Sequence, residues 1–333
     1  MKAALSILET IKLWFDSEHG LERVGDGRQF NWVRCLPFIL VHIACLAVIF
    51  VGWSPVALAV CASLYFIRMF AITAFYHRYF SHKSFKTNRF WQFCFAVLGN
   101  SATQRGPLWW AAHHRKHHKH SDEEHDLHSP AKHGFWWSHM GWFTCDAAFK
   151  TDYSIVKEWS KFPELIFLNR YDILVPIALG IGLFGFGELL SSYAPSLETC
   201  GAQLFVWGYC ISTVLLAHGT FTINSLCHTW GKRRFKTKDD SRNNIWLALI
   251  TLGEGWHNNH HRFPVSARQG FYWWEIDISY YILKLMNKLG IIWDLNPVPS
   301  KILAEGLNTD LNNNPTSAHR ANKEVFIRGT HHE

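Results

Sequence analysis

Histidines are the residues of this chain whose number and spacing point to chemistry. The chain contains 21 histidines in 333 residues, and eleven of them lie in four short clusters, HRYFSH, HHRKHHKH, NSLCH and GEGWHNNHH. Residues at positions i, i+3 and i+4 share one face of a helix. His257, His260 and His261 follow this spacing, and Asn224 and His228 form an i, i+4 pair. Each of these sets can therefore direct its side chains at one place.

The cluster HHRKHHKH is ambiguous, because two sets of three histidines fit one helix face. The first set is positions 114, 117 and 118, and the second is positions 113, 117 and 120. Spacing alone does not decide between them. In HRYFSH, His77 and His82 are five residues apart, which is about 140° around an ideal α-helix. We therefore expect the helix to end or bend between these two residues.

The number of histidines indicates two metal ions, and their type of ligand indicates iron. Imidazole binds zinc, iron, copper and nickel, and one such ion takes about four to six ligands, so nine histidines suit two ions. Zinc has no redox chemistry, and hydrolytic two-metal sites rely on bridging carboxylates. The clusters offer few carboxylates, Glu254 in GEGW and Asp122 after HHRKHHKH. A histidine-only site for two metals suits iron that handles O2.

The elements that would position these clusters are membrane spans. Four stretches are long and apolar enough to cross a bilayer, residues 36–53, 56–76, 173–190 and 202–223. The first two are joined by a tight turn at Ser54–Pro55, and the last two by SSYAPSLETCG. The sequence therefore predicts an all-α integral membrane protein with four transmembrane helices in two hairpins.

Basic residues set the expected topology. The two connecting turns contain no Lys or Arg, whereas the N-terminal 35 residues contain 5, the segment from His77 to Arg170 contains 13, and the part from Asn224 contains 14. The positive-inside rule then places both termini and the long middle segment in the cytoplasm. All four histidine clusters lie on this same side, which surface histidines would not explain. Arg68 remains inside the second span, where we expect it to snorkel or to pair with an acid such as Glu188.

The remaining composition completes the predicted organisation. We expect an N-terminal interfacial segment (1–35), a core domain (36–295) whose cytosolic helical cap comprises 77–171 and 224–295, and a flexible polar tail (296–333). The eight cysteines contain no CxxC pair and indicate free thiols. The net charge of +7, together with aromatic-rich apolar runs, favours a membrane surface over nucleic acid as the partner of the basic face.

The four clusters resemble the histidine boxes of the integral-membrane fatty acid desaturases, in particular the Δ9 acyl-CoA (stearoyl-CoA-type) branch. The resemblance covers roughly residues 35 to 295. It implies a non-haem diiron centre held by nine histidines and one asparagine, which fall on His77, His82, His114, His117, His118, Asn224, His228, His257, His260 and His261. The family pattern HRxHH thereby selects the first of the two helix faces and leaves His113 and His120 outside, together with His125, His128, His133 and His139. Asp122 is a candidate partner that orients one ligand.

The resemblance also implies a reaction, an O2-dependent removal of two hydrogens that leaves a cis double bond at Δ9 of a saturated long-chain acyl thioester. Gln104 and Trp110 match family positions beside a kinked substrate tunnel, and Trp256 is a further candidate for its wall. Reducing O2 to water takes four electrons, of which the substrate supplies two. Because the chain has no GxGxxG motif, cysteine quartet or fused haem domain, the donor is expected to be a separate protein of ferredoxin or cytochrome b5 type with its reductase.

One departure from the family leaves the acyl carrier open. Animal acyl-CoA members are expected to carry an arginine that contacts CoA two residues before the HRxHH pattern, and Ala112 occupies that position here. An acyl-lipid desaturase or a fatty acyl hydroxylase on the same scaffold are alternatives. A histidine-rich metal transporter is a third, but it predicts ligands within the spans, where only His42 and His218 lie.

Overall fold

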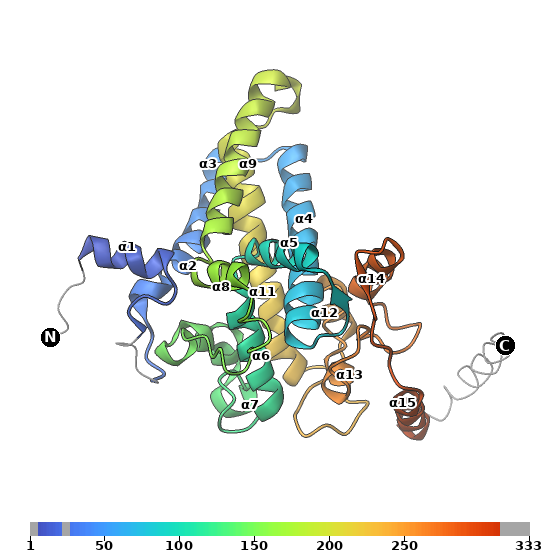
Figure 1. The fold of residues 1–333 in the computed structure, drawn as a ribbon. Coiled ribbons are helices and arrows are strands. Elements are labelled where there is room, and N and C mark those ends of the chain that lie inside the picture. Colours follow the sequence, from blue (N-terminus) through green and yellow to red (C-terminus); the bar gives the residue numbers. More distant parts are fainter. Residues whose placement is uncertain (1–5, 22–26, 314–333) are drawn as a thin grey trace.

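The computed structural model describes residues 6–21 and 27–313, and almost all of its regular structure is helical. Four helices in this part of the chain are long and apolar enough to cross a membrane, Trp32–Val51, Pro55–Ser81, Leu174–Tyr193 and Gly201–His228. They stand side by side, and most of the remaining helices gather around one end of this bundle (Figure 1). The predicted all-α fold with four membrane-spanning helices is therefore confirmed.

The first hairpin begins with α2 (Trp32–Ala44), which continues through a 3-10 turn (Cys45–Ala47) into α3 (Val48–Val51). Gly52 ends this helix in the left-handed region, with φ of +63°, which glycine adopts at no steric cost. The Ser54 hydroxyl then accepts a hydrogen bond from the Ala57 N–H at 3.1 Å, so that Ser54 caps α4 (Pro55–Phe70). The sequence Gly-Trp-Ser-Pro thus closes the hairpin within one short turn.

The second span ends at Ser81, between its two histidines as predicted, but its last part is a π-helix rather than an α-helix. After α4 the chain continues as a π-helix, Ala71–Ser81, in which the His82 N–H donates to the His77 carbonyl at 3.2 Å. A π-helix closes i to i+5 hydrogen bonds, so residues five apart lie almost one above the other. The two imidazoles consequently face the same side, with ring centroids 5.0 Å apart.

The second hairpin combines α9 (Leu174–Tyr193) with a segmented fourth span. That span consists of α10 (Gly201–Leu204), a π segment (Phe205–Ile211), α11 (Ser212–Ser225) and a 3-10 turn (Leu226–His228). It extends beyond the predicted limit of residue 223. The extension carries Asn224 and His228 past the end of the apolar stretch, toward the other histidine clusters.

The cap consists of short helices at the histidine-bearing end of the bundle (Figure 1). Its helices are α5 (Arg89–Asn100), α6 (Pro107–His120), α7 (Pro130–His133), α8 (Pro163–Arg170), α12 (Ile245–Ile250), α13 (His257–Arg262), α14 (Ile278–Lys288) and α15 (Ser300–Asn313). Two short antiparallel strands, β1 (Lys86–Thr87) and β2 (Ile292–Trp293), pair Lys86 with Trp293. Further turns, at Trp137–Gly141, Trp142–Thr144 and Asp146–Ala148, pass beside α6. The amphipathic helix α1 (Ile7–Phe15) precedes the bundle.

The interpretation of Arg68 is wrong, because its partners are neutral oxygens rather than an acid. Its guanidinium is 1% exposed and donates to Thr213 Oγ1 at 2.8 Å, to the Ser101 carbonyl at 3.1 Å and to the Ser212 hydroxyl. Glu188 instead accepts a hydrogen bond from the Gly201 N–H at 2.9 Å. Small polar residues on α11 and at the end of α5 therefore supply the hydrogen-bond acceptors for a buried guanidinium, which would be costly at membrane depth without them.

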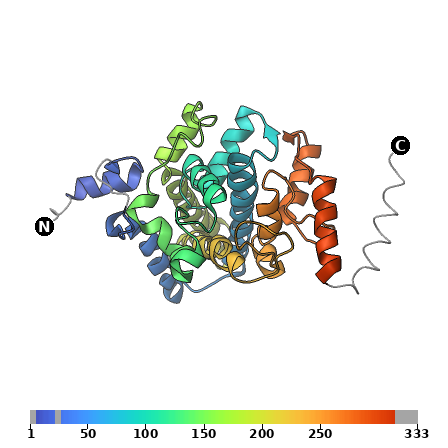
Figure 2. The same ribbon diagram turned by 90° about the horizontal axis from the view of Figure 1, so that it is seen from below.

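The predicted flexible tail from Asn296 is wrong for residues 300–313, which form α15, while 314–333 lie outside the described residues. Ile302 packs against Phe235, Phe271 and Tyr272. Two ion pairs hold the helix, Arg234 to Asp310 at 2.9 Å and Arg262 to Glu305 at 3.0 Å. In Figure 2, α15 (red) and α1 (blue) lie on opposite sides of the molecule. The asparagine-rich composition of this segment predicts a flexible chain, but apolar side chains of α15 pack against the cap.

One glycine in the cap permits a contact that no other residue allows. A Cβ on Gly99 of α5 would overlap the ring of Tyr76, which is fully buried and whose hydroxyl bonds to Asn100. We expect Gly99→Ala to destabilise the protein by about 3 kcal/mol, since overpacking a rigid core costs this much. Thermal unfolding in detergent measures the effect. Gly182→Ala in α9, whose Cβ would meet nothing within 4 Å, is the matched control and should unfold like the wild type.

Candidate metal centre

The structure brings the nine predicted histidines together in two adjacent clusters. Cluster one consists of five residues whose ring nitrogens all lie within 4.8 Å of one another, His77, His82, His114, His118 and His260. They come from the π-helix of the second span, from α6 and from α13. The shortest distances join Nε2 atoms, 2.8 Å between His82 and His114 and 2.8 Å between His118 and His260.

Cluster two consists of His117, His228, His257 and His261, whose ring nitrogens also lie within 4.8 Å of one another. His228 follows α11 and its Nε2 lies 3.1 Å from that of His257. The helices α6 and α13 each contribute histidines to both clusters. The three histidines of α6 (114, 117 and 118) and the three of α13 (257, 260 and 261) are therefore each divided between the two clusters. The rings of His118 and His261 are 4.4 Å apart across the boundary. This sharing places the two clusters side by side.

The other histidines of HHRKHHKH belong to neither cluster within the described residues. The His113 ring lies against Trp109, with centroids 4.5 Å apart, and His120 Nδ1 lies 3.2 Å from Glu123. Farther along the chain, His139 Nε2 lies 3.0 Å from His218 Nδ1, and His218 Nε2 lies 3.2 Å from His42 Nε2. His42 and His218, which lie inside the spans, thus form a separate row with His139 of the cap.

The nitrogen atoms of cluster one cannot be satisfied by hydrogen bonds among themselves. His77 donates from Nδ1 to Glu254, so its Nε2 carries a lone pair. His260 Nε2 lies 3.0 Å from this atom and 2.8 Å from His118 Nε2. A neutral imidazole has one N–H, which cannot serve two acceptors at these distances. A cation among the nitrogens would remove the repulsion between the facing lone pairs.

Cluster two shows the same need for a cation through a buried atom without a partner. His261 donates from Nδ1 to Asp239 at 2.8 Å, and its Nε2 is buried with no hydrogen-bond partner among the described residues. Buried polar atoms are rarely left unsatisfied. Five and four imidazoles, together with the Asn224 amide nearby in sequence, match the ligand number and type of two iron ions. The donor set therefore fits the diiron centre that the sequence predicts.

Four buried carboxylates hold four of these rings. Asp122 accepts from His228 Nδ1 at 2.9 Å, as proposed from the sequence. Three further carboxylates escaped the sequence interpretation as ring partners, with Asp126 accepting from His117 at 3.0 Å, Asp239 accepting from His261 at 2.8 Å, and Glu254 accepting from His77. Such partners fix the tautomer and orientation of a metal-binding imidazole. Of these three carboxylates, Glu254 is the one that the sequence places within a histidine cluster, in GEGW three residues before His257.

The surroundings favour the neutral form of six of the nine rings and the charged form of two of the carboxylates. Burial lowers the pKa of five rings well below the usual value, those of His82, His114, His118, His257 and His260. Burial also lowers the pKa of His117 to about 4, although the nearby Asp126 acts in the opposite direction. Burial alone would raise the pKa of Asp126 and Asp239, but the neighbouring imidazoles hold both pKa values far below the usual range. These six histidines are therefore available as neutral ligands near pH 7.

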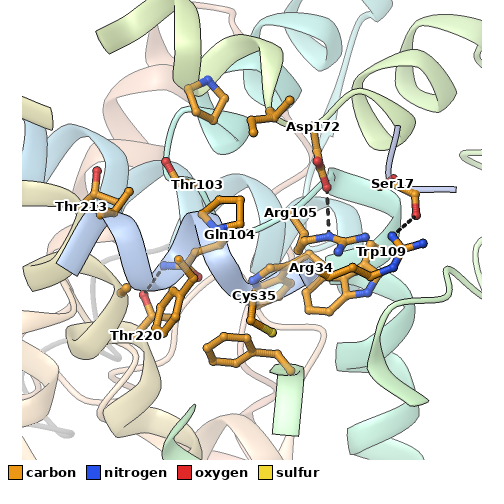
Figure 3. A pocket seen from close by; sticks show the side chains of 18 of the residues that line it. Ser17, Arg34, Cys35, Thr103, Gln104, Arg105, Trp109, Asp172, Thr213 and Thr220 are labelled. Atoms are coloured by element: carbon orange, nitrogen blue, oxygen red, sulfur yellow. Dashed lines mark hydrogen bonds and ion pairs between the residues drawn. The ribbon is translucent and has the colours of Figure 1, made fainter. Parts of the chain in front are cut away.

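A cavity of about 260 Å³ reaches the metal centre from the side of α1 and α2. His114 of cluster one, Asn224, Gln104 and Trp110 are all in its wall. Trp110 stacks on the His114 ring with centroids 5.0 Å apart. The Gln104 amide donates to Thr220, at 3.0 Å, and both residues are visible in Figure 3. The contact with Thr220 was not anticipated from the sequence.

The third predicted wall residue is placed elsewhere. Trp256 is 8% exposed, and its indole N–H donates to the Ile276 carbonyl at 2.8 Å. It is not part of the cavity wall. Apolar side chains such as Phe38, Val41, Ala217 and Phe221 make up much of the wall, together with polar side chains that include Thr213 and Thr220. This lining suits a hydrocarbon chain that lies beside His114 of cluster one.

Comparison with known proteins agrees with this chemistry. A family model described as "Fatty acid desaturase" matches residues 33–288. The chain is 38% identical to the sn-1 stearoyl-lipid 9-desaturase of Anabaena variabilis, over 79% of this chain and 93% of the relative. It is 36% identical to Delta-9 acyl-lipid desaturase 1 of Arabidopsis thaliana (82% and 86% covered) and 38% identical to the acyl-CoA C20 Delta5-desaturase of Anemone leveillei (79% and 80%).

Proposed function

The chain belongs to the fatty acid desaturase family, and on this premise we propose that it inserts a cis Δ9 double bond into a saturated acyl chain of a membrane lipid. The observation that carries the proposal is the cavity, because its apolar wall leads to His114 of cluster one. Two iron ions, held by clusters one and two with Asn224 as a further ligand through water, would supply the oxidant that an unactivated methylene requires.

The chain's own residues position the substrate for this reaction. Trp110, stacked on His114, forms one side of the passage beside the metal centre. The hydrogen bond from Gln104 to Thr220 fixes two polar side chains of the cavity wall in place. A chain that bends at these residues would present one pair of carbon atoms to the metal centre. The distance from that point to the polar end of the chain then sets the double-bond position.

The acyl-lipid form is proposed in preference to the acyl-CoA thioester expected at first. Ala112 stands where an arginine would contact CoA, and two of the three relatives named above are described as lipid desaturases. The reaction consumes O2, two electrons and two protons, removes two hydrogens from the chain and releases two water molecules. We propose that the cap faces the cytoplasm, where a separate ferredoxin or cytochrome b5 type protein with its reductase delivers the electrons.

Expression in a host without its own desaturase tests this function. We expect new cis-Δ9 monounsaturated chains in the glycerolipid fraction, identified by mass spectrometry of double-bond position in each lipid class. The same cells carrying the empty vector are the control. A hydroxylated chain without an alkene would replace the desaturase by a hydroxylase, and a double bond confined to the acyl-CoA pool would restore the thioester substrate.

A further inference from the structure

The outer end of the cavity carries more positive than negative charge. Arg34, Arg105 and Asp172 all line it, and Figure 3 shows the two arginines together with Trp109 on one side of the view. Arg105 Nε lies 3.0 Å from Asp172 Oδ2. Arg34 makes no ion pair within the described part of the chain and donates only to the carbonyls of Ser17 and His19. Among the residues that line this end, two guanidinium groups thus stand beside one carboxylate, while Asp146 and Asp16 act on Arg34 from outside the wall.

The two guanidinium groups are held at this place by the same aromatic ring. Arg34 lies 5.4 Å and Arg105 5.7 Å from the centroid of Phe149, and Arg105 also lies 5.3 Å from the Trp109 ring. Stacking on aromatic rings leaves the planar edges of arginine free for hydrogen bonds. Even the contact with Asp172 is no aligned hydrogen bond, since neither Arg105 Nε nor Asp172 Oδ2 has a hydrogen-bond partner among the residues that the structure describes. Arg105 Nη2 donates to the Phe149 carbonyl at 3.3 Å. Several donors remain available to an anion.

The position of these charged residues relative to the spans indicates how deep in the membrane the outer end of the cavity lies. Arg34 lies in the first turn of the span Trp32–Val51, and Asp172 directly precedes the span Leu174–Tyr193. The ends of membrane spans lie at the level of the lipid headgroups. Leu13 and Trp14 of α1 form another part of the wall, and the exposed side of α1 carries Ile7 and Leu8. An amphipathic helix of this kind lies in the interface plane.

We propose that Arg34 and Arg105 bind the phosphate of a phosphoglycerolipid whose acyl chain occupies the cavity. This inference rests on the proposed function and narrows its substrate to lipids that carry a phosphodiester. Arginine is suited to phosphate because its fork of N–H groups matches the phosphate oxygens. In a glycerolipid only a few bonds separate the acyl ester from the phosphate, so an anion site at the outer end of an acyl cavity suits it. In acyl-CoA the phosphates are separated from the thioester by the long pantetheine arm.

Lipid retention by the purified full-length protein tests the site without requiring turnover. The wild type and the Arg34→Gln/Arg105→Gln double variant are incubated in detergent with three probes that share a stearoyl chain, phosphatidylglycerol, monogalactosyldiacylglycerol and stearoyl-CoA, and bound lipid is quantified by mass spectrometry. We expect the wild type to retain the phospholipid at least about fivefold over the galactolipid, and the double variant to lose this preference with galactolipid retention unchanged.

The controls separate this proposal from general damage and from the proposed function. Arg89→Gln removes an exposed arginine paired with Glu164 and should retain lipids like the wild type. Arg34→Gln alone keeps the Arg105–Asp172 pair and serves where the double variant does not fold. Equal retention of the phospholipid and the galactolipid, or an equal loss of phospholipid and stearoyl-CoA, would overturn the site. A wild type that selects the phospholipid but desaturates no lipid would instead refute the proposed function alone.

Discussion

The His117→Ala variant is expected to give no detectable desaturated product in a host without its own desaturase, a loss of at least about 1,000-fold or roughly 4 kcal/mol of activation free energy. His117 is one of the four imidazoles of cluster two. Its Nδ1 donates to the buried Asp126, so alanine removes a proposed metal ligand together with this contact, while Asp126 keeps its contact with His128 at 2.8 Å. Gas chromatography of the fatty acid methyl esters measures the product.

Two neighbouring histidines provide matched controls for this variant. His125 is exposed, and His120 lies on the alternative helix face, where it contacts Glu123. Alanine at either position should keep most of the product, and the purified proteins should keep two iron ions per chain, whereas His117→Ala should keep one or fewer. An inactive His125→Ala variant, or a fully active His117→Ala variant, would contradict the assignment of ligands.

The sequence predicts the spans and the participating histidines well, because both depend on local patterns. Apolar runs of sufficient length locate the four spans within a few residues. Two of the histidine clusters directly follow a span, and the other two lie in the cap segments at the same end of the bundle. Packing of the spans into one bundle therefore brings the four clusters together. The choice between the two faces of HHRKHHKH came from the family pattern. The structure agrees with it, since positions 114, 117 and 118 join the clusters.

The division of the histidines between the two clusters was not predictable from spacing. A residue's direction around a helix says which neighbours share a face, but the two clusters lie so close together that one face of α6 serves both. The π-helix likewise escaped prediction, since an ideal α-helix was assumed for HRYFSH. Helix packing decides both features, and packing is a property of the whole bundle rather than of one segment.

Charged residues far from the clusters in sequence were the hardest to interpret. Arg34 and Arg105 could not be distinguished from the basic residues that orient a membrane protein. For Arg68 the sequence predicts snorkelling or an acidic partner, because the hydroxyl partners on α11 carry no charge signal. Asp239 lies 22 positions before His261, with which it pairs. Long-range contacts of this kind leave no periodic trace in the sequence.

The carboxylates are distributed unequally over the two clusters. Three of the four imidazoles in cluster two donate to an aspartate, namely His117, His228 and His261. In cluster one, His77 alone has such a partner among the described residues, namely Glu254. A carboxylate that accepts from one ring nitrogen increases the basicity of the other. Cluster two should therefore bind its metal ion through more basic ligands. The loss of one aspartate should lower the affinity for that ion and leave the affinity for the other unchanged.

Asp239→Asn tests this consequence, and we expect it to lower the affinity for one of the two metal ions by about 10- to 100-fold. The asparagine oxygen can still accept from the Ser241 N–H, now 3.0 Å from Asp239 Oδ1. Its NH2 group would then face His261 Nδ1 and favour the tautomer whose Nε2 is protonated and cannot bind metal. Iron retained per chain against a chelator series measures the change. Asp240→Asn is the matched control, because that side chain pairs with Arg233 at the surface. Retention of both ions at wild-type affinity in Asp239→Asn would show that the aspartate does not support the ligand.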